Sequence, residues 1–527
     1  MAPVFPAAAD PDAPLQAPLE DPGAPAHTPD ILDVLIVGAG LSGIGAAATL
    51  QRRCTDKRYL ILEERAAIGG TWDLFRYPGV RSDSDMYTLG YGFRPWTAQD
   101  AIADGATIRD YIAATAREHG IERHIRFGHT VVDAAWCSEH AHWTVQAHRA
   151  DGSSVVLHAR FLHLCSGYYD YQRAHRPRFQ GEAAYRGRIV QPQFWPHDLD
   201  YAGRRVLVVG SGATAVSLVP ALAQTAAHVT MLQRSPSYVV ARPRRDRFAL
   251  RLRRWLPEKA AYALARWRIV LESIALYRLL RVLPGFTRRR MIAMAARMLG
   301  PGIDAGTHFA PGYKPWDQRI CVAPGGDLFR ALRSGRAEVV TDEIAHFSER
   351  GVVLASGRAL EADVVVLATG LRMKILGGAT LSVDGRRVDP SRAMSYKGMM
   401  LSDVPNCALT FGYTNASWTL KADLTAEWVC RLLRWMDRRG LDIAVARRDP
   451  SVPDAPFLDL SSGYVQRAAT ILPRQGRRGP WRVHQNYLRD LAAIRWRRID
   501  DGTLRFGRAG ELPGDDVLTT PTKAASR

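Results

Sequence analysis

The chain has 527 residues, of which 47% are hydrophobic and 23% charged, and its formal net charge is +19. This balance is ordinary for a globular enzyme with two or three cores. Six cysteines without paired spacing argue against a secreted disulfide scaffold, a zinc site and a disulfide reductase, so we expect a cytoplasmic protein with reduced thiols and no bound metal.

The N-terminal part of the chain combines a polar tail with a nucleotide-binding pattern. Residues 1–30 are rich in Ala, Pro and Asp and lack the basic start and apolar centre of a signal peptide, so a disordered tail is expected. A buried parallel strand is predicted at 34–37, directly before the glycine pattern of residues 38–43. Glu63 follows about 20 residues later, where a carboxylate accepts from a ribose hydroxyl. This order predicts an FAD site.

Each glycine of the pattern has its own expected role. Gly38 permits a tight turn, Gly40 lets the backbone approach a pyrophosphate, and Gly43 lets the following helix pack against the strand. Two further glycines, at 69 and 70, let the backbone pass close to a flavin. The candidate FAD-binding residues are Gly38, Gly40, Ser42, Gly43, Glu63, Thr71, Trp72, Asp83 and Tyr87.

A second fingerprint at residues 210–215 repeats this order with one chemical change. It follows a predicted strand at 205–209, and the next strand, at 229–232, ends in Gln233 and Arg234 rather than in an acid. A carboxylate would repel a 2′-phosphate, whereas the guanidinium of Arg234 suits one. The second cofactor is therefore predicted to be NADPH, with Gly210, Gly212, Ala213, Thr214 and Arg234 as candidate binding residues.

Residues 242–312 alternate Arg-rich clusters with apolar stretches, which predicts a basic helical insertion. Charged residues interrupt every apolar stretch, so a membrane-spanning helix is not expected. Basic amphipathic helices could still contact an anionic membrane surface, and a solvated basic face is the alternative interpretation. Nucleic acid is not expected as a partner, because no nucleic-acid motif accompanies the charge.

Residues 70–87 resemble the corresponding run of the Baeyer-Villiger monooxygenases, which are class B flavin-containing monooxygenases, and residues 73–79 resemble especially the ethionamide-activating type. The likeness extends from about residue 31 to 501. The family signature, Phe-x-Gly-x-x-x-His-x-x-x-Trp-Pro, corresponds to residues 185–196, with Tyr185 in place of Phe and Gln191 in place of His. Gln191 removes a titratable group and keeps a neutral amide.

The resemblance also implies a catalytic pair. Arg319, in the run Trp316 to Arg319, matches the family's catalytic arginine, and Asp83 matches its active-site aspartate. A guanidinium supplies a permanent positive charge for a peroxide anion on the reduced flavin. Asp83 is expected to hold Arg319 through a charge-assisted hydrogen bond. The alternative for either residue alone is a surface ion pair.

The predicted fold is α/β, with two Rossmann-like dinucleotide-binding domains, for FAD and NADPH, and a helical insertion. Buried runs at 161–167 and 364–370 resemble the family's crossings between domains, so the FAD domain is expected to be discontinuous, and residues 412–418 are expected to return to the flavin. His163 is interpreted as a core residue. The expected limits are a tail at 1–30, FAD domain at 31–170, NADPH domain at 171–241, insertion at 242–312, NADPH domain at 313–370, FAD domain at 371–505 and a tail at 506–527.

The resemblance implies that the enzyme takes hydride from NADPH, uses molecular oxygen and inserts one oxygen atom beside a ketone carbonyl, giving an ester or lactone. Sulfur or nitrogen oxygenation of a substrate such as a thioether is the alternative within the class. From outside it, an NADPH oxidase that releases hydrogen peroxide and a membrane-associated binding protein also stay open. Pocket-forming loops have no local code, so substrate identity, stereochemistry and oligomeric state are not predicted.

Overall fold

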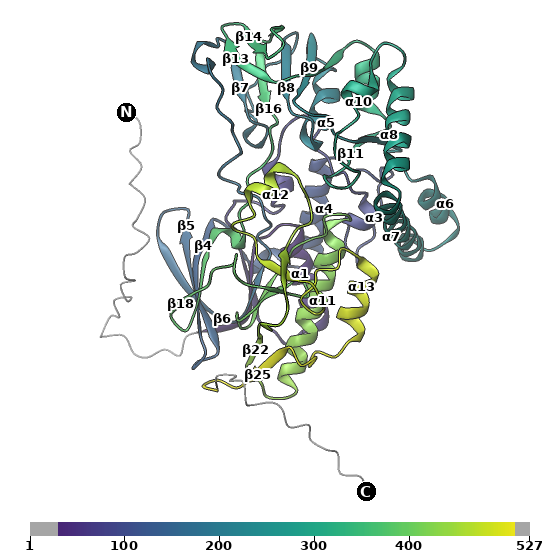
Figure 1. The fold of residues 1–527 in the computed structure, drawn as a ribbon. Coiled ribbons are helices and arrows are strands. Elements are labelled where there is room, and N and C mark those ends of the chain that lie inside the picture. Colours follow the sequence, from purple (N-terminus) through teal and green to yellow (C-terminus); the bar gives the residue numbers. More distant parts are fainter. Residues whose placement is uncertain (1–29, 512–527) are drawn as a thin grey trace.

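The computed structural model describes residues 30–511 and shows two α/β units, one above the other in Figure 1, with helices projecting at one side. In the first unit, a mixed sheet has the order β18-β17-β4-β5-β6-β1-β2-β3, and β21 also pairs with β6. Its strands are β1 (Ile31–Val37), β2 (Tyr59–Leu62), β3 (Ile125–Arg126), β4 (His129–Cys137), β5 (His142–Arg149), β6 (Ser154–Leu164), β17 (Thr380–Val383), β18 (Arg386–Arg387) and β21 (Cys407–Leu409).

Strand β1 is the centre of the first nucleotide-binding unit. It pairs in parallel with β2 and β6, and residues 34–37 are all buried, as the continuous apolar run predicts. Three residues separate β1 from helix α1 (Leu41–Arg53), which packs against α11 (Trp418–Asp437). The C-terminal end of β1 and the N-terminus of α1 therefore meet at the first fingerprint.

The second unit is built on a fully parallel sheet of order β12-β9-β8-β16-β7. Alternate residues of its central strands face two different cores: Val206 and Val208 pack with helix α5 (Ala213–Leu222), whereas Leu207 packs with Phe347 of a small antiparallel sheet. The strands are β7 (Arg188–Val190), β8 (Arg205–Val209), β9 (His228–Gln233), β12 (Ala337–Thr341) and β16 (Val364–Leu367), and the small sheet holds β13 (Ile344–Ser348), β14 (Gly351–Leu354) and β15 (Ala359–Glu361).

The basic insertion is helical, as predicted. It leaves the second unit after β10 (Val239–Arg242) and returns through β11 (Cys321–Pro324), and these two short strands pair in parallel. Between them lie α6 (Arg247–Trp255), α7 (Glu258–Val282), α8 (Pro284–Leu299) and α9 (Ala305–His308), at the side of the molecule in Figure 1. Helix α10 (Asp327–Arg333) follows β11 and packs on α5 and α8.

A buried arginine anchors the insertion to the first unit. Arg266 of α7 is 8% exposed, and its Nη1 donates to the carbonyl oxygens of Tyr87 and Gly90 at 2.8 and 2.7 Å. These carbonyls lie at the C-terminal end of the short helix α3 (Met86–Leu89), where orphan acceptors need a donor. Its Nη2 also pairs with Asp423 of α11 at 3.1 Å. The arginine thus satisfies the end of α3 and fixes the position of α7.

The expected tails require one correction. Strand β25 (Leu504–Gly507) pairs with β22 (Ile443–Ala446), so the expected C-terminal tail cannot begin at residue 506. The reason is hydrophobic packing: Phe506 is buried, with its ring 4.3 Å from that of Trp435. Asp30 also pairs with Arg58, while the rest of the expected tails, residues 1–29 and 512–527, lies outside the described residues. The other domain limits stay as expectations.

The remaining elements, apart from the longer helix α4 (Gly105–Glu118), are short. They are α2 (Thr71–Leu74), α4 (Gly105–Glu118), α12 (Gly463–Arg467), α13 (Tyr487–Leu491), β19 (Ser395–Tyr396), β20 (Met400–Leu401), β23 (Asp454–Pro456) and β24 (Arg474–Gly476), with helical turns at Glu122–His124, Glu182–Ala184, Pro192–Phe194, Leu376–Gly378 and Ala492–Trp496.

Candidate active site

The first fingerprint has the close packing that its glycines predict. A Cβ atom on Gly38 would lie 2.8 Å from the carbonyl oxygen of Cys165, and one on Gly43 would overlap the carbonyl oxygen of Gly38. Glu63 is 4% exposed, and its carboxylate accepts the backbone N–H of Ala39 at 2.6 Å. Burial raises the pKa of Glu63, although this hydrogen bond lowers it. The carboxylate is therefore fixed beside the fingerprint.

A pocket lies directly against these residues. Gly38, Gly40, Glu63 and Gly70 all line it, and the backbones of Gly40 and Gly70 face each other, since a Cβ on Gly70 would lie 3.1 Å from the Cα of Gly40. Glycine backbone next to a carboxylate is the donor and acceptor set that the pyrophosphate and ribose of FAD require. The residues present fit that cofactor.

Two other candidates, Ser42 and Thr71, form hydrogen bonds with residues far away in the sequence. Ser42 Oγ accepts from Trp418 Nε1 at 2.7 Å, so the run 412–418 does return to the first fingerprint. Thr71 Oγ1 and Tyr171 Oη are 3.0 Å apart, and Tyr171 lines the same pocket. Trp72 packs against the core of the first unit, and Tyr87 has a buried hydroxyl without a hydrogen-bond partner among residues 30–511.

The second fingerprint is open where a nucleotide would approach. A Cβ on Gly210 would overlap the carbonyl oxygen of Ala368, whereas nothing lies within 4 Å of a Cβ on Gly212. Helix α5 starts at Ala213, and Thr214 occupies its first turn, so free N–H groups point at this opening. Arg234 is exposed just beyond the end of β9, and no hydrogen bond or ion pair to another residue in 30–511 holds it. Its guanidinium is free to meet a phosphate.

A loop of the first unit, residues 77–83, packs onto the helix of the second fingerprint. Gly79 has φ of +78°, and a Cβ there would overlap the carbonyl oxygen of Ser217 in α5. Arg81 donates to Asp327 of α10 at 2.6 Å and to the carbonyl of Val216 at 3.3 Å. The loop that resembles the family thus joins the two nucleotide-binding units.

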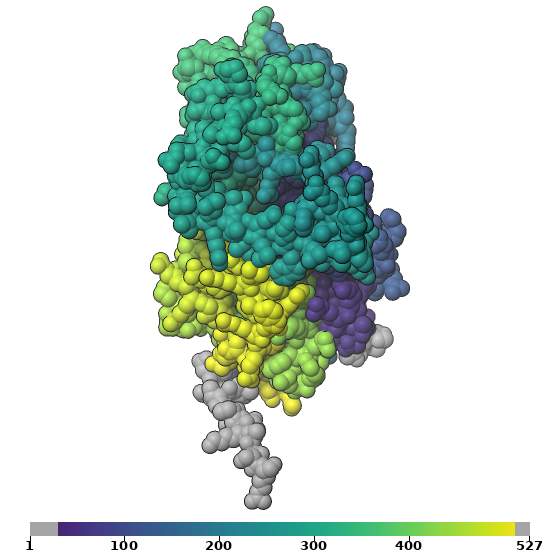
Figure 2. Space-filling view, turned by 90° about the vertical axis from the view of Figure 1, so that its right-hand side faces the viewer, coloured from purple at the N-terminus to yellow at the C-terminus, as the bar shows by residue number. Residues whose placement is uncertain are grey.

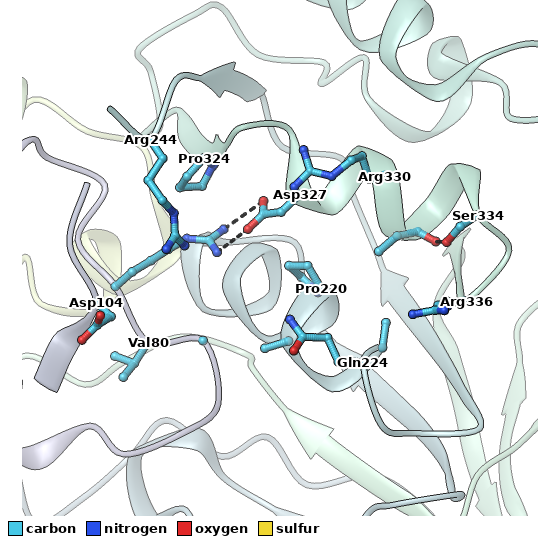
Figure 3. Close-up of a pocket in the computed structure, with 15 residues that line it drawn as sticks. Val80, Asp104, Pro220, Gln224, Arg244, Pro324, Asp327, Arg330, Ser334 and Arg336 are labelled. Carbon is cyan, nitrogen blue, oxygen red and sulfur yellow. Dashed lines mark hydrogen bonds and ion pairs between the residues drawn. The ribbon is translucent and has the colours of Figure 1, made fainter. Parts of the chain in front are cut away.

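Figure 3 shows an open pocket of about 520 Å³ at the same junction. Its lining comes from loop 79–81, the C-terminal half of α5 and α10; Arg244 and Arg330 lie near the ion pair of Asp327, and Arg336 lies farther along the pocket, near Ser334. None of the candidate glycines or acids of either fingerprint lines it. This basic pocket therefore lies at the C-terminal end of α5, away from the helix N-terminus that faces the second fingerprint.

Arg319 and Asp83 influence each other through their charges, but no direct bond joins the two side chains within residues 30–511. Burial raises the pKa of Asp83 to about 6, while Arg81 and Arg319 lower it through their charges. The expected charge-assisted hydrogen bond is wrong for this structure, because no ion pair or hydrogen bond between the two occurs among residues 30–511. Arg319 Nη2 instead donates to Tyr168 Oη at 3.4 Å. Asp83 therefore acts on Arg319 through its charge alone.

Tyrosines around Arg319 are the residues that sequence reasoning missed. Tyr168 chiefly raises the pKa of Arg319, with Tyr464 and Tyr169 acting in the same direction. The rings of Tyr168 and Tyr169 are 4.4 Å apart, and that of Tyr168 is 5.1 Å from Trp418. No motif marks these tyrosines, although two of them directly follow the crossing strand at 161–167. Together they give Arg319 an aromatic surrounding next to the first fingerprint.

The departures from the family signature have local consequences. Tyr185 Oη donates to the carbonyl of Ala362 at 2.9 Å, so the extra hydroxyl is satisfied. Gln191 Nε2 is buried, and no acceptor among residues 30–511 bonds it. His163 Nε2 lies 3.0 Å from Thr410 Oγ1, and burial lowers the pKa of His163 to about 4, as fits a core residue.

Fold and site together define a flavoprotein oxidoreductase with two nucleotide-binding units. The flavin-binding monooxygenase-like family model matches residues 100–253, and the NAD(P)-binding Rossmann-like domain model matches residues 36–101. EthA of Mycobacterium tuberculosis strain H37Rv, an FAD-containing monooxygenase, is 54% identical over 479 residues, which cover 90% of this chain and 98% of EthA. The chain belongs to this family of FAD-containing, class B flavin monooxygenases.

Other relatives agree. EthA of Mycolicibacterium smegmatis is 51% identical over 476 residues, covering 90% of this chain and 96% of the relative, and MymA of M. tuberculosis strain H37Rv is 48% identical over 486 residues, covering 91% and 98%. Among solved structures, oxidised steroid monooxygenase bound to NADP matches with a TM-score of 0.71 and 22% identity over 90% of this chain and 99% of that one. The open structure of cyclohexanone monooxygenase matches with 0.65 and 21% over 80% and 90%.

These findings confirm the predicted fold class and the predicted cofactors, FAD and NADPH. The solved structures, at 21–22% identity, support the fold only. The family membership rests on the relatives that are 48–54% identical. Across residues 30–511, no helix combines the length and apolar character that crossing a membrane requires.

Proposed function

We propose that this FAD-containing monooxygenase carries out Baeyer-Villiger oxidation, inserting one oxygen atom beside the carbonyl of a ketone. The observation that carries the proposal is the position of Arg319, a permanent cation bonded to Tyr168 and close to Asp83, where the loop of residues 77–83 joins the two nucleotide-binding units. The fold neighbours that include steroid and cyclohexanone monooxygenases support the same reaction.

The residues of the chain divide the work between binding and charge. The backbone of Gly40 would admit the pyrophosphate of FAD, Gly38 and Gly43 would permit the tight turn and the close helix packing around it, and Glu63 would accept from its ribose. Arg234 would bind the 2′-phosphate of NADPH at the end of β9. When bound, FAD supplies the redox chemistry that activates oxygen.

Arg319 would stabilise negative charge that develops during oxygen transfer. Its guanidinium stays protonated at any working pH, and the nearby tyrosines raise its pKa further. A charge fixed in advance costs no reorganisation when the reaction occurs. Asp83 would keep the net charge of the site in balance and position Arg319 electrostatically.

Product analysis by mass spectrometry tests the proposal. The holoenzyme is incubated with NADPH and a panel of ketones and matching thioethers, and product is compared with NADPH consumed. The proposal expects an ester or lactone from at least one ketone. Sulfoxides from the thioethers without any ester would show that the enzyme oxygenates sulfur and not ketones. Peroxide release without either product would indicate an oxidase.

A further inference from the structure

Exposed apolar side chains are concentrated on the helical insertion. Sixteen large hydrophobic residues are exposed within residues 30–511, and ten of them lie between residues 248 and 286. Trp255, at the end of α6, is 84% exposed, and Val282, at the end of α7, is 74% exposed. The ten are Phe248, Trp255, Leu264, Trp267, Leu271, Leu276, Leu279, Val282, Leu283 and Phe286. A gathering of this kind marks an interaction surface rather than ordinary scatter.

Helix α7 is apolar on two opposite faces. One face, with Tyr262, Ile269 and Leu280, is buried against the protein. The opposite face carries Leu264, Trp267, Leu271 and Val282, whose spacings of 3, 4 and 11 residues place them on one side of a helix. The protein itself covers only the first face.

The same helices carry most of the excess charge. Residues 247–297 contain thirteen Lys or Arg and two Glu, a net charge of +11 against +19 for the whole chain. Arg251 and Arg254 of α6 and Arg289 and Arg290 of α8 are exposed beside the apolar residues. Helices that lie in the interface of an anionic membrane typically combine leucine, tryptophan and phenylalanine with bordering arginines.

The surface continues onto the C-terminal segment. The ring of Trp267 packs 5.9 Å from that of Tyr487 at the start of α13, and Leu488 and Trp496 of that segment are exposed as well. Arg489, Arg495, Arg497 and Arg498 surround them in sequence. Figure 2 views the molecule from this side, with the teal insertion across the middle and the yellow C-terminal segment below it.

We infer that this surface, formed by α6, α7, the α7–α8 turn and α13, docks onto an anionic lipid surface. With 25 residues, α7 extends for about 37 Å, long enough to lie flat along a membrane surface. Its exposed face enters the boundary between head groups and acyl chains, and the arginines bind the phosphates. A second copy of the chain is disfavoured as the occupant, because two surfaces of this charge would repel each other.

Flotation of the FAD-loaded enzyme with lipid vesicles tests the inference. Vesicles of phosphatidylcholine with phosphatidylglycerol should bind the enzyme at low salt, and pure phosphatidylcholine vesicles should bind it far less. Binding should weaken as salt rises, because charge attraction is screened within about 10 Å at 0.1 M. Parent enzyme that fails to float with the anionic vesicles at low salt overturns the inference.

Variants separate the apolar and the basic contributions. Trp255→Glu with Val282→Glu should abolish flotation, and Arg251→Ala with Arg254→Ala should reduce partitioning by about 25-fold, since each arginine near an anionic surface adds about a fivefold gain. The matched controls are Val156→Glu, an exposed apolar residue of β6, and Arg386→Ala with Arg387→Ala on β18, on the other side of the molecule in Figure 1.

Flavin content and NADPH oxidation should stay at the parental level in all of these variants, because none of the residues lines either nucleotide site. Flotation that persists in Trp255→Glu with Val282→Glu, or that falls equally in the controls, contradicts the inference. Sedimentation covers the remaining alternative: a dimer of the parent that Trp255→Glu dissociates, without lipid binding, would assign the surface to a second copy.

Discussion

Arg81 and Asp327 connect the two nucleotide-binding units through an ion pair with an N–O distance of 2.6 Å. The two side chains are only 6% and 18% exposed, so the pair is shielded from solvent. Arg81 belongs to the loop that follows the first fingerprint, and Asp327 starts the helix that packs on α5. The relative position of the units therefore depends on this contact.

Replacing Arg81 by Ala should lower the free energy of unfolding by about 3 kcal/mol, because Asp327 is left as a half-buried charge without its partner. The measurement is a double-mutant cycle with Asp327→Ala, followed by denaturant unfolding. A coupling energy below about 0.5 kcal/mol would mean that the two residues contribute independently. Reduction of the flavin by NADPH should slow in the same variants, since hydride transfer needs both units in register.

Gly79→Ala should destabilise the junction by more than backbone strain alone. Both Gly79, with φ of +78°, and Gly152, with φ of +87°, would suffer strain of about 1 kcal/mol on gaining a side chain. Only at Gly79 would the new Cβ overlap another residue, the carbonyl of Ser217, which should add about 1 to 3 kcal/mol. Thermal unfolding of the two variants compares the costs, and equal losses would show that the loop can move away from α5.

The pH dependence of stability should report Asp83. Burial raises its pKa from 3.8 to about 6, so the folded protein binds this proton more tightly than the unfolded chain does. The protonated carboxyl group stabilises the folded protein at pH values below the ordinary pKa of 3.8. This stabilisation is lost as the pH rises through the folded-state pKa of about 6. Asp83→Asn should therefore stabilise the enzyme at pH 8 and have little effect at pH 4. A variant with the same pH profile as the parent would disprove a raised pKa.

Arg234→Ala should weaken the use of NADPH by roughly 10- to 150-fold and leave the use of NADH nearly unchanged, because a lost charge-assisted contact costs about 1.5 to 3 kcal/mol. Steady-state kinetics with both coenzymes provide the test. Arg204→Ala serves as the control, since this exposed arginine directly precedes the N-terminal end of β8, whereas Arg234 follows the C-terminal end of the parallel strand β9. If the parent used the two coenzymes with equal efficiency, the assignment of Arg234 as the residue that binds the 2′-phosphate would be contradicted.

The sequence predicts the parts of the fold that local patterns encode. The apolar runs before Gly38 and Gly210 predict buried parallel strands, and Glu63 is found beside the first fingerprint because its spacing follows from the strand and helix lengths. Arg266 shows the limit of such reasoning. Nothing near it in sequence indicates that it caps the end of α3, because that contact depends on how a distant helix packs.

The candidate site was predictable to a similar degree. The residues Asp83 and Arg319 can be chosen by resemblance, but the direction of the Arg319 guanidinium toward Tyr168 depends on packing among three separate segments. The aromatic surrounding has no spacing rule, since Tyr168 and Tyr464 are almost three hundred residues apart. Loop conformation and side-chain contacts between distant segments are therefore what the sequence leaves open.

The most direct test of the account is the amount of oxygenated product formed per NADPH consumed, measured for the parent and for Arg319→Ala with a ketone that the parent accepts. Both proteins should fold and retain FAD, because Arg319 lies outside the pocket of Glu63 and Gly40. The variant should lose oxygen transfer by about 100- to 1000-fold and release peroxide instead, since one stabilising charge is removed. If Arg319→Ala keeps the parental ratio of product to NADPH, Arg319 is not the cation that supports oxygen transfer.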